Sequence, residues 1–104
     1  MSSFDLQGKT AIVTGGAGGL GRSMVATLAA AGANVVVASR NQENISKIAD
    51  AINQKGQSAL AIAVDITNED QVDSLIEQTV AAFGSVDIIV NNAGRWGKSH
   101  KAED

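Results

Sequence analysis

The chain has 104 residues, a formal net charge of −3 and no cysteine, and 44% of its residues are hydrophobic against 18% charged. This length suits one domain, assigned to residues 1–104, and the composition excludes a disordered tail, a coiled coil and a disulfide scaffold. No apolar run is long enough to cross a bilayer, and we expect no signal peptide at residues 1–7. The acidic balance disfavours a nucleic-acid partner, and we expect a cytoplasmic protein.

Four short apolar runs alternate with three segments of helical periodicity. The runs are TAIVT at 10–14, VVVAS at 35–39, ALAIAVD at 59–65 and VDIIVN at 86–91. They are rich in valine, isoleucine and alanine with little polar alternation, which is typical of parallel strands buried on both faces. The order is therefore β-α-β-α-β-α-β, and the short connections imply right-handed crossovers and an open α/β fold.

Each helical segment carries apolar residues three or four positions apart, so that each presents one stripe to the sheet. The expected stripes are Leu20, Met24, Leu28 and Ala31 in the first helix, Ile45, Ile48, Ala49 and Ile52 in the second, and Val72, Leu75, Ile76, Thr79 and Phe83 in the third. A glycine follows each helix, at positions 32, 56 and 84, where a left-handed residue can end it. Candidate N-caps are Asn41 for the second helix and Thr67 or Asn68 for the third.

The sequence TGGAGGLG at 14–21 joins the first strand to the first helix. Glycines let backbone N–H groups approach phosphate oxygens, and the positive end of the helix dipole meets their charge. Three patterns overlap here: G-x-G-x-x-G from Gly16, T-G-x-x-x-G-x-G from Thr14, and a near P-loop over residues 16–23. Arg22 replaces the P-loop lysine, which disfavours that third pattern. We expect a phosphate-bearing ligand at the loop, the alternative being a glycine-rich turn without one.

The second strand ends in Ser39 and Arg40, about 20 residues after the glycines. In a dinucleotide-binding fold this stretch faces the adenosine ribose, where an acid would bind the hydroxyls and repel a 2′-phosphate. No acid is present, whereas Arg40 offers a planar cation suited to phosphate. The pattern favours NADP over NAD, unless Arg40 is only a solvated loop residue.

Three motifs together resemble the N-terminal half of a classical short-chain dehydrogenase/reductase. They are the T-G-x-x-x-G-x-G loop, Asp65-Ile66-Thr67, and Asn91-Asn92-Ala93-Gly94, each after an expected strand. The resemblance covers residues 6–94 and implies a three-layer Rossmann-type sheet of strand order 3-2-1-4. It also implies a set of cofactor-binding residues, namely Gly15, Gly18, Gly19, Leu20 and Gly21 at the pyrophosphate, Ser39 and Arg40 at the ribose, Asp65 and Ile66 at the adenine, and Asn92, Ala93 and Gly94 toward the nicotinamide. Two of these positions keep a structural alternative, since Asp65 suits a helix cap and Asn91-Asn92 suits a turn.

The resemblance implies an oxidoreductase that transfers hydride between a nicotinamide cofactor and a small carbonyl or alcohol substrate. Members of the family use a serine and a Tyr-x-x-x-Lys pair in their C-terminal half, whereas this chain contains no tyrosine. We therefore assign no catalytic residue and no metal site, and expect a partial domain truncated after the fourth strand, with a polar tail at 95–104. An open edge on that strand would favour a homo-oligomer. The alternatives are a non-catalytic dinucleotide-binding module, an interaction fragment and, from the near P-loop, a nucleotide hydrolase.

Overall fold

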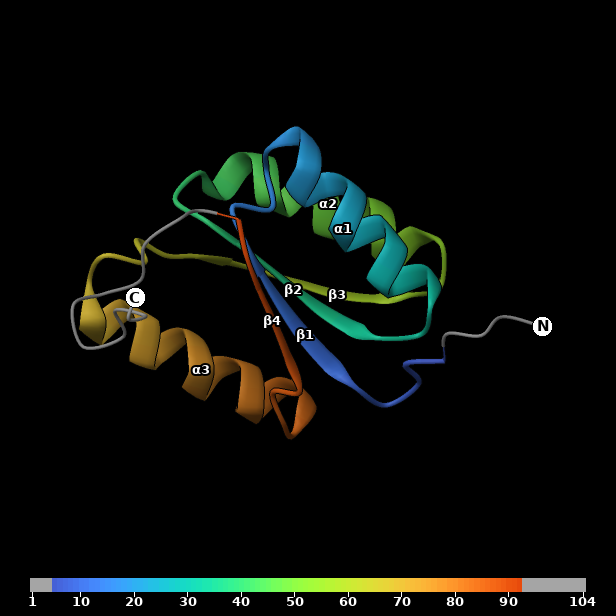
Figure 1. The fold of residues 1–104 in the computed structure, drawn as a ribbon. Helices are drawn as coiled ribbons and strands as arrows, with labels where there is room; N and C mark the ends of the chain where they lie inside the picture. The colour runs from blue at the N-terminus through green and yellow to red at the C-terminus, as the bar shows by residue number, and fades with distance from the viewer. Residues whose placement is uncertain (1–4, 93–104) are drawn as a thin grey trace.

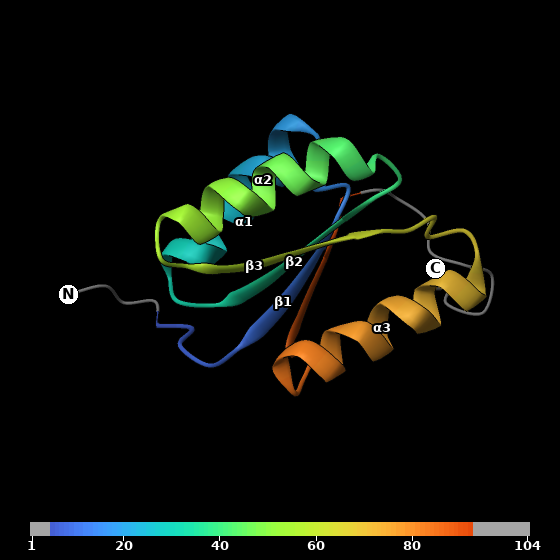
Figure 2. The ribbon, with the colours of Figure 1, turned by 180° about the vertical axis from the view of Figure 1, so that it is seen from behind.

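A parallel sheet between two layers of helices makes up the computed structural model, which describes residues 5–92 (Figure 1). The elements are β1 (Thr10–Thr14), α1 (Gly19–Ala30), β2 (Asn34–Ser39), α2 (Gln42–Gln54), β3 (Ser58–Ala63), α3 (Glu69–Phe83) and β4 (Ile88–Asn91). The strand order is β3-β2-β1-β4, with α1 and α2 on one face and α3 on the other (Figure 2). The expected α/β architecture and the order 3-2-1-4 are both confirmed.

The two central strands, β1 and β2, form the buried centre of the sheet. All five residues of β1 and the middle four of β2 are buried. The outer strands do not follow this pattern: β3 is mostly half-buried, and Ile89 of β4 is 49% exposed. The prediction that all four strands are buried on both faces is therefore wrong for β3 and β4. Each of these pairs with one neighbour only among the described residues, so each is less covered.

The buried face of α1 differs from the predicted stripe by one position. Gly21, Val25 and Ala29 are buried, whereas Leu20 is 68% exposed. The cause is the close approach of Gly21 to the glycine loop, which rotates the helix so that this glycine faces the strand ends. The stripes expected for α2 and α3 are largely correct, because their buried residues all belong to the predicted sets.

The ends of the helices follow the sequence signals. The side chains of Asn41 and Asn68 accept hydrogen bonds from the N–H groups of Asn44 and Gln71, at 3.1 Å each, and so begin α2 and α3. The glycines at 32, 56 and 84 all have positive φ. Asn68, rather than Thr67, is thus the cap of α3, and the alternative of Asp65 as that cap is wrong. Within residues 5–92 no helix combines the length and hydropathy needed to span a membrane.

The third strand is shorter than expected and ends at Ala63. The Val64 N–H still donates to the Ser39 carbonyl at 2.9 Å, but the Asp65 N–H donates to the Gln71 side chain at 2.8 Å. The chain therefore leaves the sheet at Val64, and Asp65 lies in the turn before α3 rather than at the end of a strand.

Candidate functional site

The glycine loop lies at the carboxyl end of β1, and the fold itself requires three of its glycines. Gly15 has φ +68°, a conformation that L-residues with side chains rarely adopt. A Cβ on Gly16 would lie 2.6 Å from Val37 Cγ1, and a Cβ on Gly21 would clash with the Gly15 carbonyl and lie 2.7 Å from the Gly16 Cα. These residues let the loop turn and let α1 pack against it.

The fold gives no steric reason for the other two glycines. A Cβ on Gly19 would have no heavy atom within 4 Å, and a Cβ on Gly18 would have only the Gly15 carbonyl at 3.7 Å. The backbone in front of them is therefore open to a ligand. Within residues 5–92 no hydrogen-bond acceptor meets the N–H groups of Gly19, Leu20 and Gly21. Helix α1 also begins without a side-chain cap and without an acidic residue in its first turn, unlike α2 and α3.

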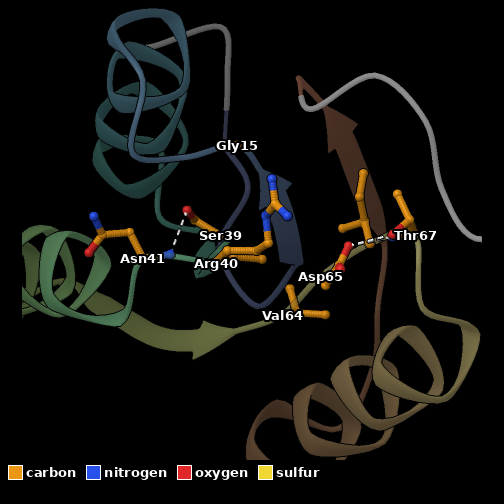
Figure 3. A pocket seen from close by; sticks show the side chains of 9 residues that line it. Gly15, Ser39, Arg40, Asn41, Val64, Asp65 and Thr67 are labelled. Carbon is orange, nitrogen blue, oxygen red and sulfur yellow. Dashed lines mark hydrogen bonds between the residues drawn. The ribbon is translucent and has the colours of Figure 1, made fainter.

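A cavity of about 320 Å³ opens beside this loop, over the carboxyl ends of β1, β2 and β3 (Figure 3). Its walls are Gly15, Ala38, Ser39, Arg40, Asn41, Val64, Asp65, Ile66 and Thr67. In parallel α/β sheets, ligands bind at this end of the strands. The structure thus brings five of the predicted site residues together around one space: Gly15, Ser39, Arg40, Asp65 and Ile66.

Asp65 is held as a carboxylate on one side of the cavity. Its Oδ1 accepts hydrogen bonds from the Thr67 hydroxyl at 2.7 Å and from the Thr67 N–H at 3.0 Å. The hydroxyl, then the N–H and then the positive charge of Arg40 lower the pKa of Asp65. At neutral pH the side chain is therefore ionised and acts only as an acceptor.

Ser39 and Arg40 face this carboxylate from the end of β2. The Ser39 hydroxyl oxygen accepts a hydrogen bond from the Asn41 N–H at 3.2 Å, which leaves its own O–H available as a donor. In Figure 3 the Arg40 guanidinium extends toward the glycine loop and lies between Gly15 and Asp65. The cavity therefore has donors on its β2 side and an acceptor on its β3 side.

The end of β4 lies on the other side of β1 from the cavity. The Thr14 hydroxyl donates to Asn91 Oδ1 at 2.9 Å, which joins β1 to β4. The Asn92 N–H donates to the Thr14 carbonyl at 3.2 Å, and its side-chain amide contacts Met24 Sδ at 3.6 Å. Asn92 is thus placed between β1 and α1. The two predicted residues that follow it, Ala93 and Gly94, lie outside the described residues.

Four residues of the cavity wall were not predicted as site residues: Ala38, Asn41, Val64 and Thr67. Ala38 and Val64 line it only because the strands end there, which no residue type signals. Thr67 carries a usable signal, because a threonine two residues after an aspartate favours a local side-chain turn. Within residues 5–92 no group of three His, Cys, Asp or Glu side chains is placed to hold a metal ion.

The fold and this site define a Rossmann-like α/β protein. The family model described as short chain dehydrogenase matches residues 9–104, and the chain belongs to that family. Its relatives include the short chain dehydrogenase/reductase dpchG of Colletotrichum higginsianum, 44% identical over 92 residues, and the 7alpha-hydroxysteroid dehydrogenase of Escherichia coli K12, 42% identical over 92 residues. Each alignment covers 88% of this chain, and 34% and 36% of the respective relative.

A crystal structure of hydroxysteroid dehydrogenase from Escherichia coli superimposes with a TM-score of 0.83 at 42% identity. The match covers 86% of this chain and 38% of that one. The chain thus spans about a third of the length of the curated relatives it matches. Membership of this family implies a nicotinamide dinucleotide, NAD or NADP, as cofactor. It also favours the dinucleotide interpretation of the glycine loop over the near P-loop.

Proposed function

We propose that this chain binds NADP(H) across the carboxyl ends of β1, β2 and β3. One observation carries the proposal: Gly15 belongs both to the glycine loop and to the cavity wall, so that the two are continuous. A ligand that fills both would meet the N–H groups of α1 with an anionic group, and would meet Arg40 and Asp65 with groups that accept and donate hydrogen bonds. A dinucleotide has this composition, and Gly18 and Gly19 leave the space that its pyrophosphate needs.

The proposed contacts follow the family resemblance and the geometry together. The pyrophosphate lies against the N–H groups from Gly15 to Gly21, including Leu20, and the adenine lies between Asp65 and Ile66. Asn92, Ala93 and Gly94 extend the site toward the nicotinamide. When bound, the cofactor supplies or accepts a hydride, and the protein supplies position and charge.

The preference for the 2′-phosphate is assigned to Arg40 with Ser39. Both line the cavity at the end of β2, Ser39 as the last residue of the strand and Arg40 as the next, where an acid in an NAD-binding protein would meet the ribose. Guanidinium donors bind phosphate in a bidentate manner, and the Ser39 O–H adds one further donor. Asp65 is the only acid of the cavity wall and lies on its β3 side.

The test is a calorimetric titration of the protein with NADPH and with NADH. We expect NADPH to bind more tightly, and Arg40→Asp to reverse the order, since the new carboxylate repels the phosphate and accepts from the ribose hydroxyls. The loss of one charged hydrogen-bond pair should weaken NADPH binding by about ten- to a hundredfold.

Lys55→Asp is the matched control, because it makes the same change of charge at the exposed C-terminal end of α2, away from the cavity. It should leave both affinities within about twofold of the wild type. An unchanged NADPH affinity in Arg40→Asp would refute the assignment. Failure of the wild type to bind either dinucleotide would refute the function itself.

The whole protein is proposed to be an NADP-dependent oxidoreductase that acts on a small carbonyl or alcohol compound. A non-catalytic dinucleotide-binding module is the second candidate, because the cavity and the glycine loop are all that such a module needs. Oxidation of NADPH in the presence of a panel of carbonyl compounds separates the two. A single domain over residues 1–104, a cytoplasmic location and a homo-oligomeric state stay predictions from the sequence.

A further inference from the structure

The Asp65 carboxylate is bound by its own turn on one oxygen only. Both hydrogen bonds from Thr67 go to Oδ1, and within residues 5–92 no partner reaches Oδ2. Asp65 and Thr67 both line the cavity, where Figure 3 draws the contact between them. The two bonds to Oδ1 fix the rotation of the carboxylate and leave its second oxygen available to a ligand.

The backbone of this turn is held by other residues. The Asp65 N–H donates to the Gln71 side chain at 2.8 Å, and the Asp65 carbonyl accepts from the Asn68 N–H at 3.0 Å. Asn68 also caps α3 through its side chain. The Thr67 hydroxyl therefore contributes nothing to the main-chain path, and its side chain is exposed. Among residues 5–92, the one hydrogen bond that the hydroxyl makes is to the Asp65 carboxylate.

We infer that Thr67 is a positioning residue, whose hydroxyl orients Asp65 so that Oδ2 accepts a hydrogen bond from the amino group of the adenine. This inference rests on the proposed function, because it assigns the nucleoside end of the same dinucleotide to the cavity. A carboxylate with one oxygen already occupied by two donors needs no reorganisation when the ligand binds, and this lowers the free-energy cost of recognition.

Because Asp65 carries a titratable charge, the affinity for the adenine end of the ligand should depend on pH. Its ionised form accepts the bond, so affinity for an adenine dinucleotide is lost as pH falls through its pKa, which the Thr67 hydroxyl lowers. Removal of the hydroxyl raises that pKa, and the loss then begins at a higher pH. Arg40 faces Asp65 as a fixed cation, and Glu69 and Asp70 lie in the first turn of α3. Variants at Thr67 keep all three charges.

The experiment compares Thr67→Val, which has the same shape without the hydroxyl, with Thr67→Ser, which keeps it. Each is titrated at pH 7 with NADPH, and with the analogue in which hypoxanthine replaces adenine and removes the amino group. Each is also titrated with NADP⁺, which is stable in acid, between pH 8 and pH 3, because the pKa of Asp65 lies below its usual value. We expect Thr67→Val to weaken NADPH binding about five- to tenfold, the effect of one hydrogen bond. The affinity for the analogue should change less than about twofold. The affinity of Thr67→Val for NADP⁺ should also fall at a higher pH than that of the wild type.

Thr67→Ser should match the wild type in its affinity for each ligand and in the pH at which that affinity falls. The inference is overturned if Thr67→Val binds NADPH like the wild type, if it weakens both ligands equally, or if Thr67→Ser behaves like it. Each of these results leaves the proposed function intact, since NADPH still binds the wild type. Absence of NADPH binding in the wild type overturns the proposed function and this inference with it.

Discussion

A methyl group added at Gly21 would clash with the backbone of Gly15 and Gly16, whereas one added at Gly19 would meet nothing within 4 Å. The two glycines are separated by one residue on α1 but serve different purposes. Gly21 permits the contact between helix and loop, and Gly19 leaves open backbone toward the cavity end of the sheet. A substitution at Gly21 should therefore affect the stability of the fold, and a substitution at Gly19 should affect the binding of the ligand.

We predict that Gly21→Ala lowers the free energy of unfolding by about 1–3 kcal/mol, because its Cβ displaces backbone atoms that cannot rotate away. Gly19→Ala should leave that free energy within about 0.5 kcal/mol of the wild type. A larger side chain, in Gly19→Leu, should keep the melting temperature and abolish NADPH binding. Urea denaturation and dinucleotide titration measure the two effects, and tight binding by Gly19→Leu would contradict the proposed pyrophosphate site.

The sequence indicated that the glycines of the loop have a role. It did not show which glycines the fold requires and which leave space for a ligand. Three overlapping patterns could be placed on the loop from Thr14, because the letters show only where side chains are lacking. The positive φ of Gly15 and the contact between Gly16 and Val37 depend on where β2 lies, and this is tertiary information.

At the scale of the elements, β3 lies at one edge of the sheet, and a side chain of α2 occupies part of its open hydrogen-bonding edge. Asn53 of α2 donates to the Ala59 carbonyl at 3.0 Å and accepts from the Ala59 N–H at 2.9 Å. The amide thus makes the two hydrogen bonds that a neighbouring strand would make. It satisfies the backbone at that point of the edge and blocks the approach of a second chain.

We predict that Asn53→Ala promotes self-association through β3, because the Ala59 backbone groups become available. Loss of the two hydrogen bonds should also lower the free energy of unfolding by about 1–2 kcal/mol. Asn44→Ala makes the same change at an exposed position of the same helix and is the control. Sedimentation velocity over a range of concentrations measures the association, and identical profiles for the two variants would contradict the role of Asn53.

Element boundaries and helix caps were predicted better than the orientation of α1. The asparagine caps and terminal glycines are local signals, and the structure confirms them. The apolar stripe through Leu20 predicted the wrong face, because the close contact at Gly21 outweighs the burial of one leucine side chain. A pattern of hydrophobicity assigns no weight to glycine, although glycine fixes the rotation of this helix.

At the scale of the whole molecule, Asp87 joins the first described strand to the last. Its Oδ2 accepts from the Thr10 N–H at 2.9 Å and from the Ser85 hydroxyl at 2.9 Å, and its own N–H donates to the Thr10 carbonyl at 2.8 Å. The Thr10 N–H, then the Ser85 hydroxyl and the charge of Lys9 lower the pKa of Asp87. No sequence signal indicated this contact, because its partners are 77 residues apart.

We predict that Asp87→Asn lowers the melting temperature at neutral pH. Because the pKa is lower in the folded than in the unfolded state, the ionised carboxylate stabilises the fold above its unfolded pKa of about 4. This contribution is lost as pH falls through the folded pKa, so the variant and the wild type should converge in acid. Calorimetry between pH 2 and pH 8 measures the difference, and Asp73→Asn, an exposed change on α3, should show no such convergence. A constant difference at every pH would contradict the assignment.

The α/β layers were accessible from sequence because alternation of unlike elements leaves few topologies, whereas the strand order was implied by the family resemblance. The three walls of the cavity, by contrast, come from segments about 25 residues apart: Gly15 after β1, Ser39–Asn41 at the end of β2 and Val64–Thr67 after β3. Each segment is anchored to its own strand, and the hydrogen bonds between segments join backbone groups, such as the Val64 N–H and the Ser39 carbonyl. Side chains in one segment can therefore be exchanged while the main-chain path of the other two is kept. Evolution can thus retune which nucleotide is accepted one contact at a time, while the buried scaffold underneath stays the same.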